Sequence, residues 1–109
     1  VFNISGGTVN LNSLTITGGS TSGSGGGVFI GSGATVTISN STISGNTANN
    51  GGGLYNTGSL SVSDSTISGN SATSNGGGLY NNGSVGITSS TLSGNSALSA
   101  GGGILNDLG

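Results

Sequence analysis

The chain repeats itself about every 25 residues, and this periodicity limits the folds open to it more than any other feature. Triplets of glycine begin at residues 25, 51, 76 and 101, and the string Ser-Thr-(Ile/Leu)-Ser-Gly-Asn returns at 41–46, 65–70 and 90–95. Such recurrence is typical of solenoids, where each residue lies roughly 4.8 Å above its counterpart. An antiparallel sandwich built on the Asn-Gly turns is the alternative, but a hairpin array does not require identical residues at this interval.

Within each repeat, apolar residues alternate with Ser, Thr or Asn, as in TVTIS at 35–39 and SLSVS at 59–63. A period of two indicates half-buried strands. The sequence therefore predicts an all-β fold, a three-faced parallel β-helix with about four coils of 24–27 residues. Right-handed coiling follows from the rule for parallel crossovers. We expect one β-helix segment over residues 1–109, with coils at 1–27, 28–53, 54–78 and 79–103 and the start of a fifth at 104–109.

Alignment of the repeats places aliphatic residues in columns that should face inward. Burial of each such side chain stabilises the fold by about 1.5–3 kcal/mol relative to exposure. No single coil can bury its own face, so the stability must come from neighbouring coils. The predicted inward ladder consists of Val28, Leu54, Leu79, Ile104, Val36, Leu60, Val85, Ile38, Val62, Ile87, Ile43, Ile67 and Leu92.

Asn46, Asn70 and Asn95 form a polar column behind the third predicted strand. Asn tolerates the backbone conformation of a corner, so we expect an asparagine ladder whose amides hydrogen-bond from coil to coil. A ligand site is the alternative, although amides alone recruit metals weakly.

Four aromatic residues, Phe2, Phe29, Tyr55 and Tyr80, alternate with the inward column beside them. Strict alternation predicts an outward aromatic ladder that stiffens one face or offers a contact surface. An inward aromatic stack, with the parity reversed, is the alternative.

The composition removes most chemistry. The chain has no Lys, Arg, His or Cys, and Asp64 and Asp107 are its only acids, in different columns. Paired carboxylates and a base for the serines are therefore missing, so we expect no enzyme activity, no cofactor and no metal site. A net charge of -2 without basic residues argues against nucleic acid as a partner, and apolar runs of at most three residues argue against membrane insertion.

The motifs resemble the β-helix repeats of polymorphic outer-membrane proteins and autotransporter adhesins. Those repeats carry Gly-Gly-Ala-Ile-like and Phe-x-x-Asn motifs, although here the Ala is Gly and the Phe is Ile or Leu. The resemblance implies a right-handed β-helix and an extracellular or cell-surface setting. The matching strings are GGGV at 25–28, GGGL at 51–54 and 76–79, GGGI at 101–104, ISGN at 43–46 and 67–70, and LSGN at 92–95.

The first residues, VFN, match the column occupied by ILN at 104–106. Copies could therefore stack end to end, or the chain could belong to a longer array. The leading hypothesis is a non-enzymatic extracellular β-solenoid of a surface fibre or filament, with other copies of itself as partner. Alternatives are an adhesin shaft that binds glycans or a host surface, and an ice-binding β-helix using Thr-x-Thr at 15–17 and 35–37. Sequons permit glycosylation at Asn3, Asn40 and Asn82.

Overall fold

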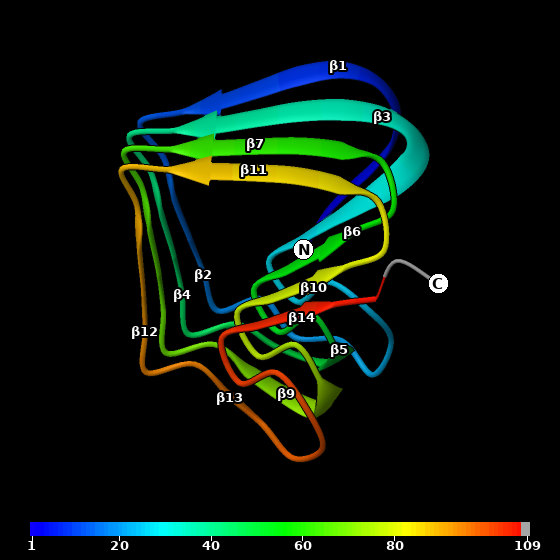
Figure 1. The fold of residues 1–109 in the computed structure, drawn as a ribbon, viewed down its shortest axis with the longest axis vertical. Coiled ribbons are helices and arrows are strands. Elements are labelled where there is room, and N and C mark those ends of the chain that lie inside the picture. Colours follow the sequence, from blue (N-terminus) through cyan, green and yellow to red (C-terminus); the bar gives the residue numbers. More distant parts are fainter. Residues whose placement is uncertain (108–109) are drawn as a thin grey trace.

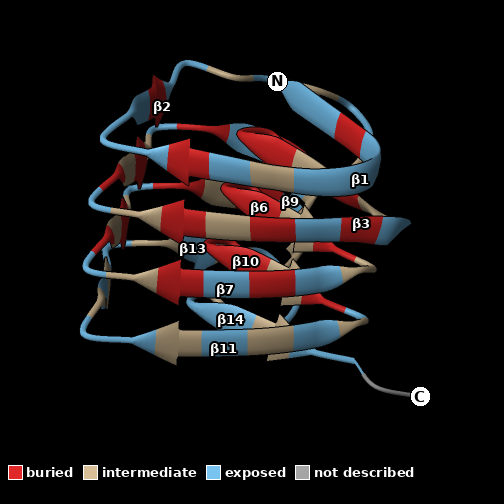
Figure 2. Ribbon diagram, turned by 90° about the horizontal axis from the view of Figure 1, so that it is seen from above, coloured by how far each residue is buried: buried red, intermediate tan, exposed pale blue. Residues whose placement is uncertain are grey.

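The computed structural model describes residues 1–107 and shows a solenoid of about four coils in which every strand pair is parallel. The coils overlie one another in Figure 1 and stack as layers in Figure 2. The molecule measures 31 × 26 × 21 Å. Among the described residues, no helix is long and apolar enough to cross a membrane.

The strands form three sheets, and the largest bends around one corner of the solenoid. It contains β1 (Phe2–Asn12), β3 (Val28–Ser39), β6 (Leu54–Asn56), β7 (Ser59–Ser63), β10 (Leu79–Asn81), β11 (Ser84–Thr88) and β14 (Ile104–Asn106). The second sheet contains β2 (Thr15–Thr17), β4 (Thr42–Ser44), β8 (Thr66–Ser68) and β12 (Thr91–Ser93). The third contains β5 (Thr47–Asn50), β9 (Ser71–Asn75) and β13 (Ser96–Ala97).

The long strand β3 serves two faces of the solenoid. Its first residues pair with β6, and its last residues pair with β7. We call the face containing β6, β10 and β14 the first face, and the face containing β7 and β11 the second face. The bend between them lets one chain segment close the core on two sides (Figure 1).

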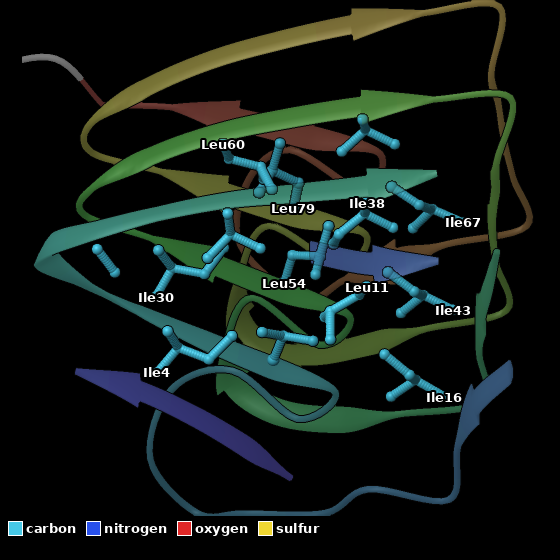
Figure 3. Packing of buried hydrophobic residues seen from close by; sticks show 14 residues of the cluster. Ile4, Leu11, Ile16, Ile30, Ile38, Ile43, Leu54, Leu60, Ile67 and Leu79 are labelled. Atoms are coloured by element: carbon cyan, nitrogen blue, oxygen red, sulfur yellow. The ribbon is translucent and has the colours of Figure 1, made fainter. Parts of the chain in front are cut away.

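The register stacks like residues on like, and this stacking makes the core. Leu54 pairs with Val28 and Leu79, while Ile43 pairs with Ile16 and Ile67. Figure 3 shows Leu54 and Leu79, and Ile16, Ile43 and Ile67, with their side chains in the interior of the solenoid. Nine members of the predicted inward ladder are buried here, namely Val28, Leu54, Leu79, Val36, Leu60, Ile38, Val62, Ile43 and Ile67.

The remaining members of that ladder belong to the last described coil. Val85, Ile87 and Leu92 are partly buried and pack against the core, whereas Ile104 is 41% exposed. Their burial is lower because no further coil covers them within residues 1–107, as the colours of β11 and β14 show in Figure 2.

The third sheet was not predicted, since the sequence indicated only three strands per coil. Ala48 and Ala72 are its buried residues, and they pair with each other across β5 and β9. Strands of two to five residues with a single small apolar side chain carry too little alternation to be recognised.

The expected place of Phe2 in the aromatic column is wrong by one residue. Phe2 pairs with Val28, and Asn3 pairs with Phe29. This register brings Ile4 against Ile30, and both are buried. Pairing Phe2 with Phe29 would move Ile4 off that contact, so burial of Ile4 decides the register. An irregularity between Ile4 and Gly6 then restores the expected pairing of the later residues of β1.

The glycine triplets need glycine for two separate reasons. The first member, such as Gly51, has a φ of 65°, which glycine adopts without steric cost. The second, such as Gly52, lies against the backbone carbonyls of Ser71 and Gly77, and a Cβ there would stand only 2.6 Å from the Gly77 oxygen. Consecutive coils therefore approach too closely at this corner for any side chain.

Candidate functional site: stacked polar and aromatic ladders

A column of buried asparagines joins consecutive coils next to the second sheet. The Oδ1 of Asn70 accepts hydrogen bonds of 3.0 Å from both the backbone N–H and the Nδ2 of Asn46. The Nδ2 of Asn70 donates to the Ile43 carbonyl at 2.9 Å. Asn95 repeats this arrangement one coil later, accepting from Asn70. The three residues predicted as an asparagine ladder thus lie in one hydrogen-bonded column, with Asn46 and Asn70 fully buried.

A serine column stands at the neighbouring corner. The Oγ of Ser65 accepts from the Ser41 backbone N–H at 3.1 Å and donates to the Ser63 carbonyl at 2.8 Å. Ser90 accepts in the same way from the Ser65 N–H. The preceding residues, including Asn40 and Asp64 with φ of 50°, adopt the left-handed conformation that turns the chain. This column was not predicted, because exposed and buried serines look alike in a chain so rich in serine.

A second asparagine column lies on the first face and was also not predicted. Asn56 donates from Nδ2 to the Oδ1 of Asn81 at 2.7 Å, and Asn81 donates to Asn106 at the same distance. Asn56 pairs with Ile30 in the coil before it, so one inward column changes from isoleucine to asparagine. A polar residue can follow Ile30 because its amide is satisfied, with Oδ1 accepting from the Gly58 N–H of its own coil and Nδ2 donating to Asn81 of the next.

The three columns leave little free hydrogen-bonding capacity inside the solenoid. Within residues 1–107, no buried side-chain nitrogen or oxygen lacks a partner. The same part of the chain contains no cluster of three His, Cys, Asp or Glu residues. The amides are therefore committed to one another, and their role in the described structure is to hold coils in register.

The aromatic residues of the first face form a continuous stack on its outer side. The ring centroids of Phe29 and Tyr55 are 5.3 Å apart with an interplanar angle of 6°. Those of Tyr55 and Tyr80 are 4.9 Å apart at 13°. All three side chains are half-buried, and they alternate with buried neighbours such as Leu54 and Asn56. Both faces of the Tyr55 ring are therefore covered, by Phe29 on one side and by Tyr80 on the other.

The last ring of the stack is tied to an acid. The Tyr80 hydroxyl donates to Oδ2 of Asp107 at 2.8 Å. This hydrogen bond, with smaller effects of burial and of the negative charge of Asp107, raises the pKa of Tyr80 above 10.0. Asp64, by contrast, lies at the corner between β7 and β8, so the two acids occupy different positions in their coils.

Outward hydroxyls line an open depression of about 320 Å³ across β3, β7 and β11. One row contains Thr35, Ser59 and Ser84, and the next contains Thr37 and Ser61 but ends at Gly86. The predicted sequon residues Asn3, Asn40 and Asn82 are all exposed on the outside of the solenoid.

Coils stacked in register around these ladders define a parallel β-solenoid repeat protein. A family model for the Chlamydia polymorphic membrane protein repeat matches residues 40–57, 64–82 and 89–107, about half of the chain. The chain belongs to this family, whose members are surface or outer-membrane proteins. No curated protein and no solved structure matches it.

Each matched segment begins at a left-handed corner residue and ends just after a first-face strand. It therefore contains one member of the serine column, one of each asparagine column and one glycine triplet. The residues that form the hydrogen-bonded ladders thus recur in every segment that the family model matches.

Proposed function

We propose that this chain is a structural, non-enzymatic part of a cell-surface β-solenoid. It forms a short length of a rod that projects from the cell. The observation that carries the proposal is the coincidence of the family repeat with the ladders that fix coil on coil. The residues matched by the family model include those that join consecutive coils, and a rod requires such contacts between its coils.

The outer surface supports the same proposal. Ser, Thr and Asn dominate it, and the chain carries no basic residue and only two acids. Such a surface is wetted by water without attracting charged partners. The stability of the fold outside a cell would then depend on the stacked core and not on disulfides, which this cysteine-free chain cannot form.

The adhesin and ice-binding hypotheses receive less support from the geometry. The Tyr55 ring is stacked on both sides at 4.9–5.3 Å and presents only its edge to a sugar. The hydroxyl row of Thr37 and Ser61 ends at Gly86, so a regular threonine grid does not extend across the second face.

Cysteine labelling on intact cells tests the surface location. Ser32 is exposed, whereas Ala34 at the same corner is 2% exposed. With a membrane-impermeant maleimide, Ser32→Cys should be labelled on intact cells and Ala34→Cys only after denaturation. Labelling of Ser32→Cys only after cell lysis would contradict the proposal.

A further inference from the structure

The chain contains three Asn-Gly pairs, a dipeptide that can react with itself because glycine has no side chain to obstruct the attack. The glycine nitrogen attacks Cγ of the asparagine side chain, a C–N bond forms and ammonia leaves, which gives a five-membered succinimide. Water then opens the ring to aspartate or isoaspartate. The attack needs a peptide unit that can rotate and a glycine N–H that is not held. The three pairs are Asn50-Gly51, Asn75-Gly76 and Asn82-Gly83.

The peptide units of the first two pairs are held on both sides by backbone hydrogen bonds to neighbouring coils. In the first pair, the Asn50 carbonyl accepts from the Gly25 N–H, and the glycine N–H donates to the Asn75 carbonyl, each at 2.9 Å. In the second pair, the Asn75 carbonyl accepts that same hydrogen bond, and the glycine N–H donates to the Ala100 carbonyl at 2.9 Å. Rotation of either unit breaks two hydrogen bonds, so both pairs are protected in the folded protein.

The peptide unit of the third pair is not held in this way. It lies at the corner between β10 and β11, where Asn82 is exposed. Within residues 1–107, neither the Asn82 carbonyl nor the Gly83 N–H has a backbone partner, and the Gly83 N–H donates to Oδ1 of Asn81 at 3.3 Å. The N–H groups of Asn82 and Ser84 donate to the preceding coil at 2.8 and 2.9 Å. This one unit can therefore rotate while the backbone on either side stays in place.

The freedom of this unit belongs to the corner and does not depend on its place near the last coil. One coil earlier the same corner is Thr57-Gly58, and a further coil covers it. In the described part of the chain, its carbonyl and N–H also lack backbone partners, and the Gly58 N–H donates to Oδ1 of Asn56 at 3.0 Å. The two corners thus share one geometry, and only the later one carries a reactive asparagine.

We propose that Asn82 is a site of spontaneous deamidation in the folded protein, through a succinimide formed with Gly83, and that the other two pairs stay intact. The reaction uses only the chain itself and water. It is independent of where the protein is located and of what its outer surface contacts.

The product changes the corner in two respects. Aspartate or isoaspartate at position 82 adds one negative charge to a chain whose net charge is -2. Isoaspartate also adds a methylene group to the main chain next to Gly83, which lies against the Gly58 carbonyl. Because Asn82 is the acceptor of a sequon, its conversion removes that possible glycosylation site.

Mass spectrometry of the folded chain, kept at mildly alkaline pH, measures conversion of amide to acid at each pair. Chymotrypsin cuts after Tyr55 and Tyr80, which places each pair in a separate peptide. Asn82 should convert at least about fivefold faster than Asn50 or Asn75, because each of those pairs must first lose two backbone hydrogen bonds. In denaturant the three pairs should convert at similar rates, since the dipeptide is the same.

Two variants separate the effect of the corner from that of the residue. Asn82→Ser should remove the fast conversion from its peptide. Thr57→Asn places an Asn-Gly pair at the equivalent corner, and this pair should convert at a rate similar to that of Asn82. Equal rates at the three native pairs of the folded chain would overturn the proposal. So would an Asn82 that stays intact while the denatured chain reacts, or a Thr57→Asn pair that reacts as slowly as Asn50.

Discussion

Asn70 is the residue at which the stacking of coils is most directly tested. Its Oδ1 is the acceptor for two buried donors of Asn46. Asn70→Ala should lower the free energy of unfolding by at least about 2 kcal/mol, because each buried donor left without an acceptor costs about 1–3 kcal/mol. Asn82→Ala is the matched control, since its side chain is exposed, and it should change stability by less than about 0.5 kcal/mol. Denaturant unfolding of both variants measures the difference, and equal stabilities would show that the column is dispensable.

Tyr80 gives the molecule a pH dependence at alkaline pH. Its folded-state pKa is raised by the hydrogen bond to Asp107, so the stabilisation is complete below 10.0 and is lost as pH rises through the folded pKa. In a Tyr55→Phe background only Tyr80 titrates as a tyrosine. Asp107→Asn in that background should lower the Tyr80 pKa toward 10.0, as followed by tyrosinate absorbance. An unchanged titration would mean that the contact with Asp107 does not persist in solution.

At the scale of elements, alanine substitutions at two glycines distinguish the effect of close contact between coils from the effect of backbone freedom. Both glycines have an ordinary φ. A Cβ on Gly52 would collide with carbonyl oxygens of two adjacent strands, whereas a Cβ on Gly86 meets nothing within 4 Å. Gly52→Ala should destabilise the fold by about 1–3 kcal/mol. Gly86→Ala should be neutral or stabilise it by up to about 1 kcal/mol, because the unfolded chain loses freedom. Thermal unfolding of the pair checks this, and similar melting temperatures would refute the role given to Gly52.

The solenoid and its parallel strands could be predicted because Ile43, Ile67 and Leu92 recur where a stack needs them. The Asn56 column could not, because an inward asparagine needs partners for its amide, here Gly58 of its own coil and Asn81 of the next, and alternation along one strand does not reveal them. Phe2 was misplaced for a related reason. Alignment by sequence assumes that paired strands run without interruption, whereas the pairing of Ile4 with Ile30 leaves two residues of β3, Gly31 and Ser32, opposite the single residue Ser5 of β1.

At the scale of the whole molecule, stability should fall along the axis. The second coil buries Val36, Ile38 and Ile43 almost completely, whereas the equivalent Val85, Ile87 and Leu92 are only partly buried. Repeat arrays open from their least covered units, so native-state hydrogen exchange should be slowest in β3 and β4 and clearly faster in β11 and β12. Uniform exchange across all coils would indicate that the described chain unfolds as one unit.

The coils differ in length at particular corners, and this has a consequence for what the rod can carry. Residues 31–34 connect the first and second faces in one coil, whereas residues 57–58 suffice in the next. The segments 35–46, 59–70 and 84–95, which hold the serine column and the column of Asn46, Asn70 and Asn95, keep a constant length. Sequence inserted at the variable corner would project sideways and leave the columns aligned. The scaffold can therefore carry unrelated loops at one corner, spaced along the axis by the fixed distance between coils.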